Sequence, residues 1–174
     1  MALVQISRGA EVKHTYVDGV SRVPILEGAY HDATVERISI QPGADLTPEI
    51  FSRQEHNQVF LITAGKGYIV TPRRVFNITE VSVFVPDFDK EQFTFHCAAD
   101  AKENMEIVHF VTELSDYDKT CLKESHLTLP RFRGVSQAWH YKEDFTGADI
   151  QQMMLIEHRN LGRLSMGANF GTGP

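Results

Sequence analysis

The sequence QVFLITAGKGYIVT, residues 58–71, decides the fold of this chain. Its first six residues, Gln58 to Thr63, are strand formers, and the glycine-rich turn 64–67 interrupts them. Tyr68 to Thr71 then resumes the β-branched and aromatic pattern. Short strands separated by turns, with no helical period between them, indicate an all-β sandwich or barrel rather than a βαβ fold.

The alternation of strand and turn continues on both sides of this stretch. On the N-terminal side, Val35 to Ile40 predicts a strand that ends at the Pro-Gly turn 41–45. In the C-terminal strand that we expect from Met105 to Val111, Ile107 and His109 share one face, and their neighbours share the other. The strands expected between these points are Val75 to Ile78, Val81 to Val85 and a short segment in which Phe93 and Phe95 alternate with polar residues.

One short helix is expected after the last of these strands, from Ser115 to Ser125. Ser115 suits the N-cap position, and Asp116 and Asp118 suit the positive end of the helix dipole. Beyond Leu127 the sequence is rich in turn residues, so we expect a loop.

The last part of the chain contains two further strand candidates, Ile150 to Glu157 and Arg163 to Phe170. They echo the start of the chain, because 25–27 and 37–40 resemble 155–157 and 163–166. These strands either open a second copy of the domain or add to the first sheet or to a partner subunit. We therefore divide the chain into an N-terminal arm and first strand (1–28), a barrel (29–114), and a helix, linker and additional strands (115–174).

Composition excludes several classes of partner. The chain has 174 residues, which fits one domain, and its net charge is −6 with no block of Lys or Arg, so neither nucleic acid nor an anionic membrane surface is an expected partner. The N-terminus lacks the apolar core of a signal peptide, and no stretch reaches the length of a membrane span, which predicts a cytoplasmic protein. Cys97 and Cys121 are interpreted as small buried thiols rather than a disulfide framework.

The stretch from Ile40 to Val111 resembles the cupin superfamily. Pro42-Gly43 matches the opening turn of the first cupin segment, residues 58–67 match its strand and glycine turn, and residues 81–93 (VSVFVPDFDKEQF) match the second segment, with Pro86 in place of its proline. The resemblance implies a cupin-type double-stranded β-helix, a jelly-roll barrel, with one short helix and a C-terminal strand extension.

The resemblance also implies where a metal would be held, and the ligands of the family are replaced at all four positions. The cupin glutamate falls on Gln58, and the last histidine falls on Glu91. The two histidines of the His-x-His pair fall on Ser52 and Gln54, or on Phe51 and Arg53, depending on the spacing used. Neutral oxygens are weak ligands for a divalent ion, so we favour no metal cofactor. The alternative is a rearranged site for Mn, Fe, Ni or Zn made of His56, Glu91 and His96.

A small-molecule site is the preferred interpretation of the same region. Amides and an arginine in an aromatic setting suit a sugar or an organic acid, because Arg pairs with carboxylates and amides both donate and accept. The ligand-binding candidates are Arg53, Gln54, Gln58, Phe60, Glu91 and Phe93.

Three functional hypotheses follow. The first is a metal-poor cupin domain that binds a small polar molecule, as the N-terminal, non-catalytic half of a two-cupin protein. The second is a metal-dependent cupin isomerase, lyase or dioxygenase with the rearranged site. The third is a ligand-sensing or assembly subunit without catalysis. We expect a homodimer or association with a second cupin domain, with Trp139 and His140 as candidates for the contact.

Overall fold

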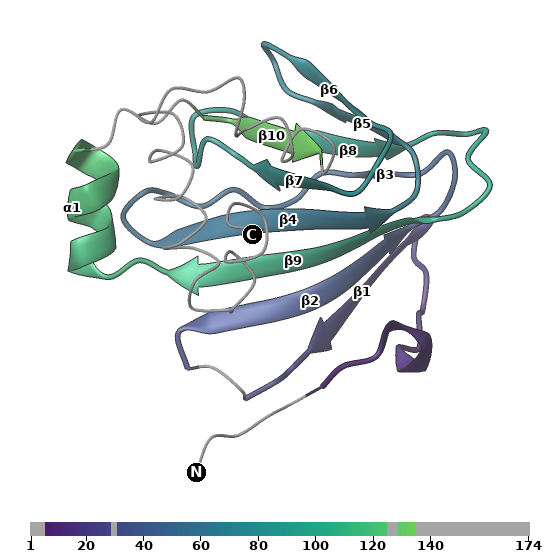
Figure 1. Cartoon of the computed structure of the whole chain (residues 1–174), viewed down its shortest axis with the longest axis horizontal. Helices are drawn as coiled ribbons and strands as arrows, with labels where there is room; N and C mark the ends of the chain where they lie inside the picture. Colours follow the sequence, from purple (N-terminus) through teal and green to yellow (C-terminus); the bar gives the residue numbers. More distant parts are fainter. Residues whose placement is uncertain (1–5, 29–30, 125–128, 135–174) are drawn as a thin grey trace, which may run out of the picture.

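The computed structural model describes residues 6–28, 31–124 and 129–134, which form two antiparallel β-sheets and one short helix (Figure 1). A single 3-10 turn, Gly9–Glu11, lies in the N-terminal arm. The strands are β1 (Val20–Ile25), β2 (Ala33–Ile40), β3 (Asp45–Leu46), β4 (His56–Ala64), β5 (Gly67–Val70), β6 (Val75–Ile78), β7 (Ser82–Val85), β8 (Thr94–Cys97), β9 (Met105–Glu113) and β10 (Arg131–Gly134), and the helix is α1 (Asp116–Glu124).

The larger sheet has six strands in the order β1-β2-β9-β4-β7-β10, and the smaller has four in the order β3-β8-β5-β6. Every strand pairing in both sheets is antiparallel. In the larger sheet, β9 lies between β2 and β4, so segments far apart in the sequence are neighbours. The expected all-β class with one short helix is confirmed.

The main core lies between the two sheets. Alternate residues of each strand point into it, because successive side chains of a strand lie on opposite faces. Its side chains come from both sheets and are at most 3% exposed: Ile38, Ile40, Phe60, Ile62, Ile69, Ile78, Phe84, Phe93, Phe95, Cys97, Met105 and Ile107. We call this set the inter-sheet core, and the face of the larger sheet that points into it the inner face.

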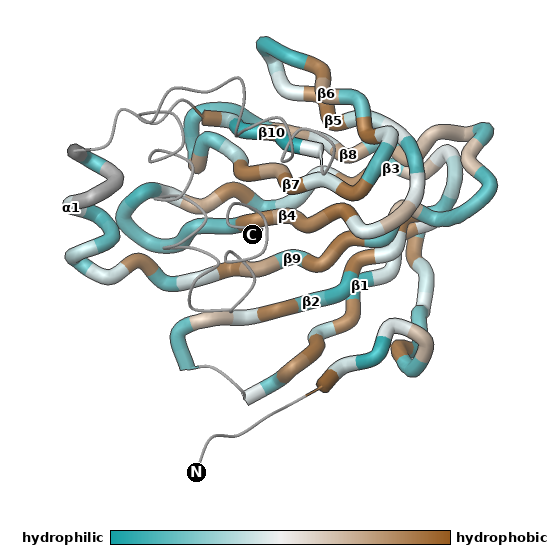
Figure 2. The backbone as a smooth tube through the Cα atoms, viewed as in Figure 1, coloured by the Kyte–Doolittle hydropathy of each residue, from teal (hydrophilic) through white to brown (hydrophobic). Residues whose placement is uncertain are grey.

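The outer face of the larger sheet carries a second apolar cluster. In β4, Phe60 and Ile62 belong to the inter-sheet core, whereas Val59 and Leu61 belong to the outer cluster with Val85 and Phe110. Burial on both faces explains why the sequence of β4 is a continuous hydrophobic run rather than an alternating one. Figure 2 shows this hydrophobic colour along β4 and β9.

The predicted elements from Val35 to Ser125 are confirmed, with boundaries that differ by one or two residues. Helix α1 begins one residue after the expected cap, Ser115. The Ser115 hydroxyl accepts a hydrogen bond from the Asp118 amide (3.2 Å), and the Asp118 carboxylate accepts one from the Ser115 amide (3.0 Å). This reciprocal pair is a capping box, so both residues fix the start of the helix.

One expectation is wrong: the segment after Leu127 is not only loop. Strand β10, Arg131–Gly134, pairs with β7 and extends the larger sheet. Phe132 lies opposite Phe84, and its ring centroid is 5.6 Å from that of Phe76, so one aromatic side chain anchors the strand. A four-residue strand with one large apolar residue has too little pattern for sequence analysis to detect.

Several sequence-based predictions fall outside the described residues. These are the strands expected at 150–157 and 163–170, the internal echo, and Trp139 and His140. Cys97 is a buried free thiol, and burial raises its pKa. Within the described part of the chain, no helix is long and apolar enough to cross a membrane.

Candidate ligand-binding pocket

The inner face of the larger sheet carries polar side chains next to the inter-sheet core. Antiparallel register places Ile38, Ile107 and Ile62 side by side across β2, β9 and β4. Two residues further along, the same strands place Glu36, His109 and Phe60 side by side. Because a step of two residues stays on one face, these three side chains also lie on the inner face.

Glu36 is the centre of a hydrogen-bonded network at this end of the sheet. Arg22 of β1 donates to its carboxylate through Nε (3.0 Å to Oε2) and through Nη2. His109 lies on its other side, with Nδ1 2.7 Å from Oε1. The carboxylate of Glu36 is therefore bound by a guanidinium and an imidazole at once.

His109 has protein acceptors at both ring nitrogens. Its Nε2 is 3.0 Å from Oε1 of Gln58, whose Nε2 donates to the carbonyl oxygen of Glu49 (2.9 Å). A ring nitrogen that carries a proton donates to the oxygen that it faces. The ring also stacks on Phe60, with centroids 4.2 Å apart and planes inclined by 5°. His109 is 3% exposed, so its orientation is fixed on every side.

The charges of this network determine the ionisation of Glu36. Burial on its own would raise the pKa of the Glu36 carboxyl, but hydrogen bonds from His109 and Arg22, together with their charges, outweigh burial and lower the pKa to about 2. The same hydrogen bond to Glu36 raises the pKa of Arg22, and the nearby charge of Glu49 adds to this. Glu36 and Arg22 are thus a charged pair at neutral pH.

A cavity of about 500 Å³ opens beside this network. Its inner-face wall is formed by Arg22, Pro24, Thr34, Glu36, His109 and Val111, the segment before β4 adds Glu49 and Phe51, and the end of β1 and start of β2 add Ile25, Leu26, Glu27, Gly28, Ala33 and Val35. We call it the mouth pocket. Its size is that of a small-molecule site, and its lining is largely apolar with a few convergent polar groups.

The predicted ligand-binding residues do not form one site. Gln58, Phe60 and Phe93 are contiguous: Gln58 bonds to His109, and Phe60 packs edge-on against Phe93 with centroids 5.4 Å apart. Phe60 and Phe93 are fully buried in the inter-sheet core, so they fill space rather than line a cavity. Gln54 is exposed in the turn before β4.

Arg53 and Glu91 belong to a separate ionic cluster at the β7–β8 loop. Arg53 pairs with the buried Asp87 (3.5 Å), and Glu91 accepts a hydrogen bond from Nε of Arg73 (2.9 Å). Arg73 and Lys90 also pair with Asp87, at 3.9 Å and 3.4 Å. The cluster ties this loop to the turn between β5 and β6, and its carboxylates are already neutralised by arginine and lysine.

The alternative metal ligands are also placed apart. His96 lies on the outer face of the smaller sheet, where its Nδ1 is 2.6 Å from Asp45 and its ring stacks on Tyr68. His56 lies on the inner face at the start of β4, against Phe51, and Glu91 is in the β7–β8 loop. Within the described ranges, no group of three or more His, Cys, Asp or Glu side chains is placed to hold a metal ion.

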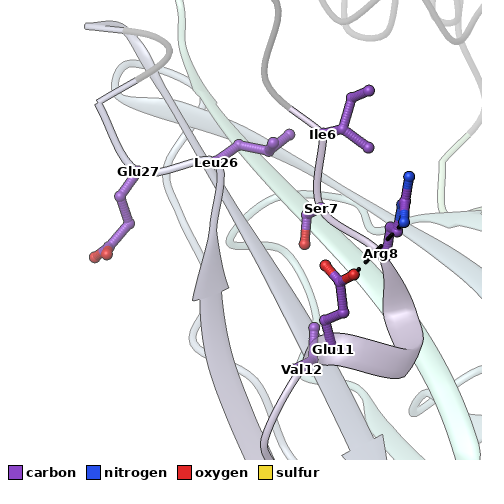
Figure 3. Close-up of a pocket in the computed structure, with 7 residues that line it drawn as sticks. All are labelled: Ile6, Ser7, Arg8, Glu11, Val12, Leu26 and Glu27. Atoms are coloured by element: carbon purple, nitrogen blue, oxygen red, sulfur yellow. Dashed lines mark ion pairs between the residues drawn. The ribbon is translucent and has the colours of Figure 1, made fainter.

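A second hollow, of about 390 Å³, adjoins the mouth pocket on the side of the N-terminal arm. Figure 3 shows Leu26 extending toward Ile6 across this hollow, whereas the Glu27 carboxylate points away from the arm. The charged residues of the arm here, Arg8 and Glu11, are exposed and pair with each other at 3.7 Å. The lining of this hollow is therefore mixed, with Ser7, Arg8, Glu11 and Glu27 beside Ile6, Val12 and Leu26.

Sequence analysis identified Gln58 but missed Arg22, Glu36 and His109. The signal was present in the alternation of two strands. Glu36 follows the period of Ile38 and Ile40, and His109 follows the period of Met105 and Ile107, so each is a polar residue on an otherwise apolar face. Pairing the two requires the β2–β9 register, which brings together segments about seventy residues apart.

Comparison with known proteins supports a fold and no more than a fold. No protein-family model and no curated protein matches the sequence. Among solved structures, KdgF from Halomonas sp. matches with a TM-score of 0.51 and 13% identity over 66% of this chain and 98% of its own. A predicted oxalate decarboxylase from Thermotoga maritima matches with a TM-score of 0.52 and 16% identity, over 63% and 100%. A cupin-2 domain from Rhodospirillum rubrum has a TM-score of 0.48 and 16% identity, over 71% and 88%.

Proposed function

We propose that this chain, which has the cupin fold, binds a small polar molecule in the mouth pocket through its own side chains. The observation that carries the proposal is the cavity of about 500 Å³ beside the Arg22–Glu36–His109 network, in which His109 is buried and Glu36 half-buried. Removing polar groups from water costs free energy, and hydrogen bonds within the network offset that cost. The same hydrogen bonds hold each side chain in one position. Such a network offers a ligand a rigid polar wall.

The apolar part of the pocket supports the same function. Pro24, Phe51 and Val111 line it next to the charged groups, so a ligand can bury carbon surface while its polar groups face the network. Phe51 comes from the segment between β3 and β4, and Gln58 holds that segment through the carbonyl of Glu49. The pocket is therefore assembled from several strands and one tethered segment.

The residues present do not fit the divalent metal that the fold family implies. Gln58, at the position of the family glutamate, uses its amide on Glu49 and His109. Glu91, at the position of the last family histidine, bonds to Arg73. An amide and a neutralised carboxylate on different parts of the fold are not a ligand set for Mn, Fe, Ni or Zn. The proposed function is therefore binding by protein side chains alone.

Blocking the cavity tests the proposal. Thr34 is exposed and lines the pocket, so Thr34→Trp would place an indole in the cavity at a strand position that tolerates aromatic residues. The full chain is screened by thermal shift against sugars, amino sugars, sugar acids and small organic acids. We expect at least one class to raise the unfolding midpoint of the wild type and to lose that effect in Thr34→Trp.

Val75→Trp is the matched control, because Val75 is an exposed strand residue (60%) of β6 that does not line the pocket. It should respond to the same compounds as the wild type. The proposal is wrong if no compound class shifts the midpoint, or if a shift survives in Thr34→Trp while that variant remains folded by circular dichroism.

A further inference from the structure

The positively charged groups of the mouth pocket are already used by the protein. Two donors of Arg22 bind Glu36, and both ring nitrogens of His109 face protein oxygens. A ligand carboxylate can reach the N–H groups of Arg22 that Glu36 leaves unused, but taking over the paired donors would mean exchanging Glu36 for the ligand. That exchange leaves a partly buried carboxylate without its partners, which costs more than the new ion pair returns.

The negatively charged groups Glu49 and Glu27 differ from Arg22 and His109 in whether they have protein partners. Glu49 and Glu27 both line the cavity and are exposed. Neither side chain makes an ion pair within 4 Å or a hydrogen bond in the described part of the chain, although the charge of Glu49 helps to raise the pKa of Arg22. A ligand can therefore pair with these carboxylates without displacing a hydrogen bond or ion pair among the described residues.

We propose that the mouth pocket takes a small hydroxylated organic cation, such as an amine-bearing sugar, in preference to an organic acid of the same size. The inference rests on the proposed function and specifies the ligand class of that site. The ammonium group would pair with Glu49 and Glu27, and the carbon skeleton would lie against Pro24 and Phe51, whose ring face also attracts a cation. This choice differs from the sugar or organic acid expected from the arginine and amides of the sequence.

A matched set of pyranoses separates the alternatives. D-glucosamine, D-glucose and D-glucuronate share a ring and differ mainly in charge, and ligand-observed NMR titration of the full chain gives a dissociation constant for each. We expect glucosamine to bind at least about tenfold more tightly than glucuronate, because one charge is attracted and the other repelled. High salt should reduce this difference, because exposed charges are screened.

Substitution of Glu49 tests whether its carboxylate causes the preference for a cation. Glu49→Gln should weaken glucosamine binding about threefold to tenfold and weaken glucose binding less, because only glucosamine loses an ion pair. Glu103→Gln is the control, because Glu103 is also exposed but precedes β9, at the end of that strand remote from the pocket.

The outcomes distinguish this inference from the function on which it rests. If glucuronate binds as tightly as glucosamine and Thr34→Trp abolishes both, the pocket binds ligands and the preference for cations is wrong. The preference is also wrong if Glu49→Gln and Glu27→Gln both leave glucosamine affinity unchanged. If none of the three sugars binds at concentrations on the order of 10 mM, this inference fails, whereas the proposed function fails only if the wider thermal-shift screen also finds no ligand.

Discussion

At the scale of single residues, the carboxylate of Glu36 is the group whose ionisation the fold controls most visibly. Its pKa falls from the ordinary value of 4.5 to about 2. Because the pKa is lower in the folded state, ionised Glu36 stabilises the fold above about pH 4.5, and this contribution is lost as the pH falls toward 2. After allowance for partial solvent screening, the contribution is about 1–3 kcal/mol.

Glu36→Gln should therefore lower the free energy of unfolding at pH 7 by about 1–3 kcal/mol, because an amide cannot pair with Arg22 and His109 as an anion does. The difference from the wild type should shrink as the pH falls from about 4.5 toward 2, since the wild type then protonates Glu36 as well. Urea denaturation at a series of pH values measures both. A difference that stays constant down to pH 2 would contradict the argument, and Glu103→Gln supplies an exposed control.

Sequence analysis predicted the surroundings of a residue correctly where the residue's own strand sets them. It failed where another segment of the chain sets them. Phe60, Phe93 and Phe95 were identified as an aromatic group, and all three are in the inter-sheet core. Whether they line a pocket or fill the core depends on the facing sheet, and the structure shows that they fill it. Arg53 was interpreted as a ligand-binding residue, but it pairs with Asp87, about thirty residues away, a contact that no local pattern indicates.

At the scale of elements, the glycine turn that follows β4 fixes how the chain leaves the larger sheet. Gly65 has φ of +88°, and a Cβ there would lie 2.5 Å from Cα of Met105 and 2.7 Å from the carbonyl oxygen of Asn104. Both atoms belong to the backbone at the start of β9 and cannot move aside cheaply. Gly65 is thus required for its conformation and for its lack of a side chain.

Gly65→Ala should destabilise the protein by about 3 kcal/mol or more, since strain at positive φ adds to a backbone clash. Gly28 is the matched control: its φ is +71°, but a Cβ there meets no atom of the described residues within 4 Å. Gly28→Ala should cost only the conformational strain, about 1 kcal/mol. Equal losses in the two variants, measured by urea denaturation at pH 7, would show that contact with β9 is not the cause.

The elements also show why the fold was easier to predict than the site. Strand β4 is a long apolar run bounded by a glycine turn, and helix α1 has a capping residue and two acidic residues in its first turn, so each is specified locally. The mouth pocket has no such local signature, because β1, β2, β9 and the segment before β4 all contribute residues to it. Sequence spacing cannot show that these segments meet without the strand order of the larger sheet.

At the scale of the whole molecule, the two antiparallel sheets enclose an interior that is apolar at its centre and polar at one end. The inter-sheet core is filled by aromatic side chains, with Phe60, Phe84, Phe93 and Phe95 in mutual contact. Two residues further along the strands of the larger sheet the side chains are polar, and the imidazole of His109 and the guanidinium of Arg22 bind the carboxylate of Glu36. The guanidinium of Arg22 and the imidazole of His109 thus hold the half-buried carboxylate of Glu36 there. The expected homodimer or second cupin partner remains a prediction.

This arrangement predicts that the stability of the protein does not depend on a metal. Purified, untagged chain should contain well under one equivalent of Mn, Fe, Ni or Zn by elemental analysis, and EDTA should leave its thermal midpoint unchanged, because Gln58 and Glu91 are committed to protein partners. His109→Gln should alter ligand binding without altering metal content. One equivalent of metal, removed by EDTA with a lower midpoint and absent from the His109→Gln or Glu91→Gln variant, would show that these side chains rearrange around an ion and that the protein network described here is not the resting state of the pocket.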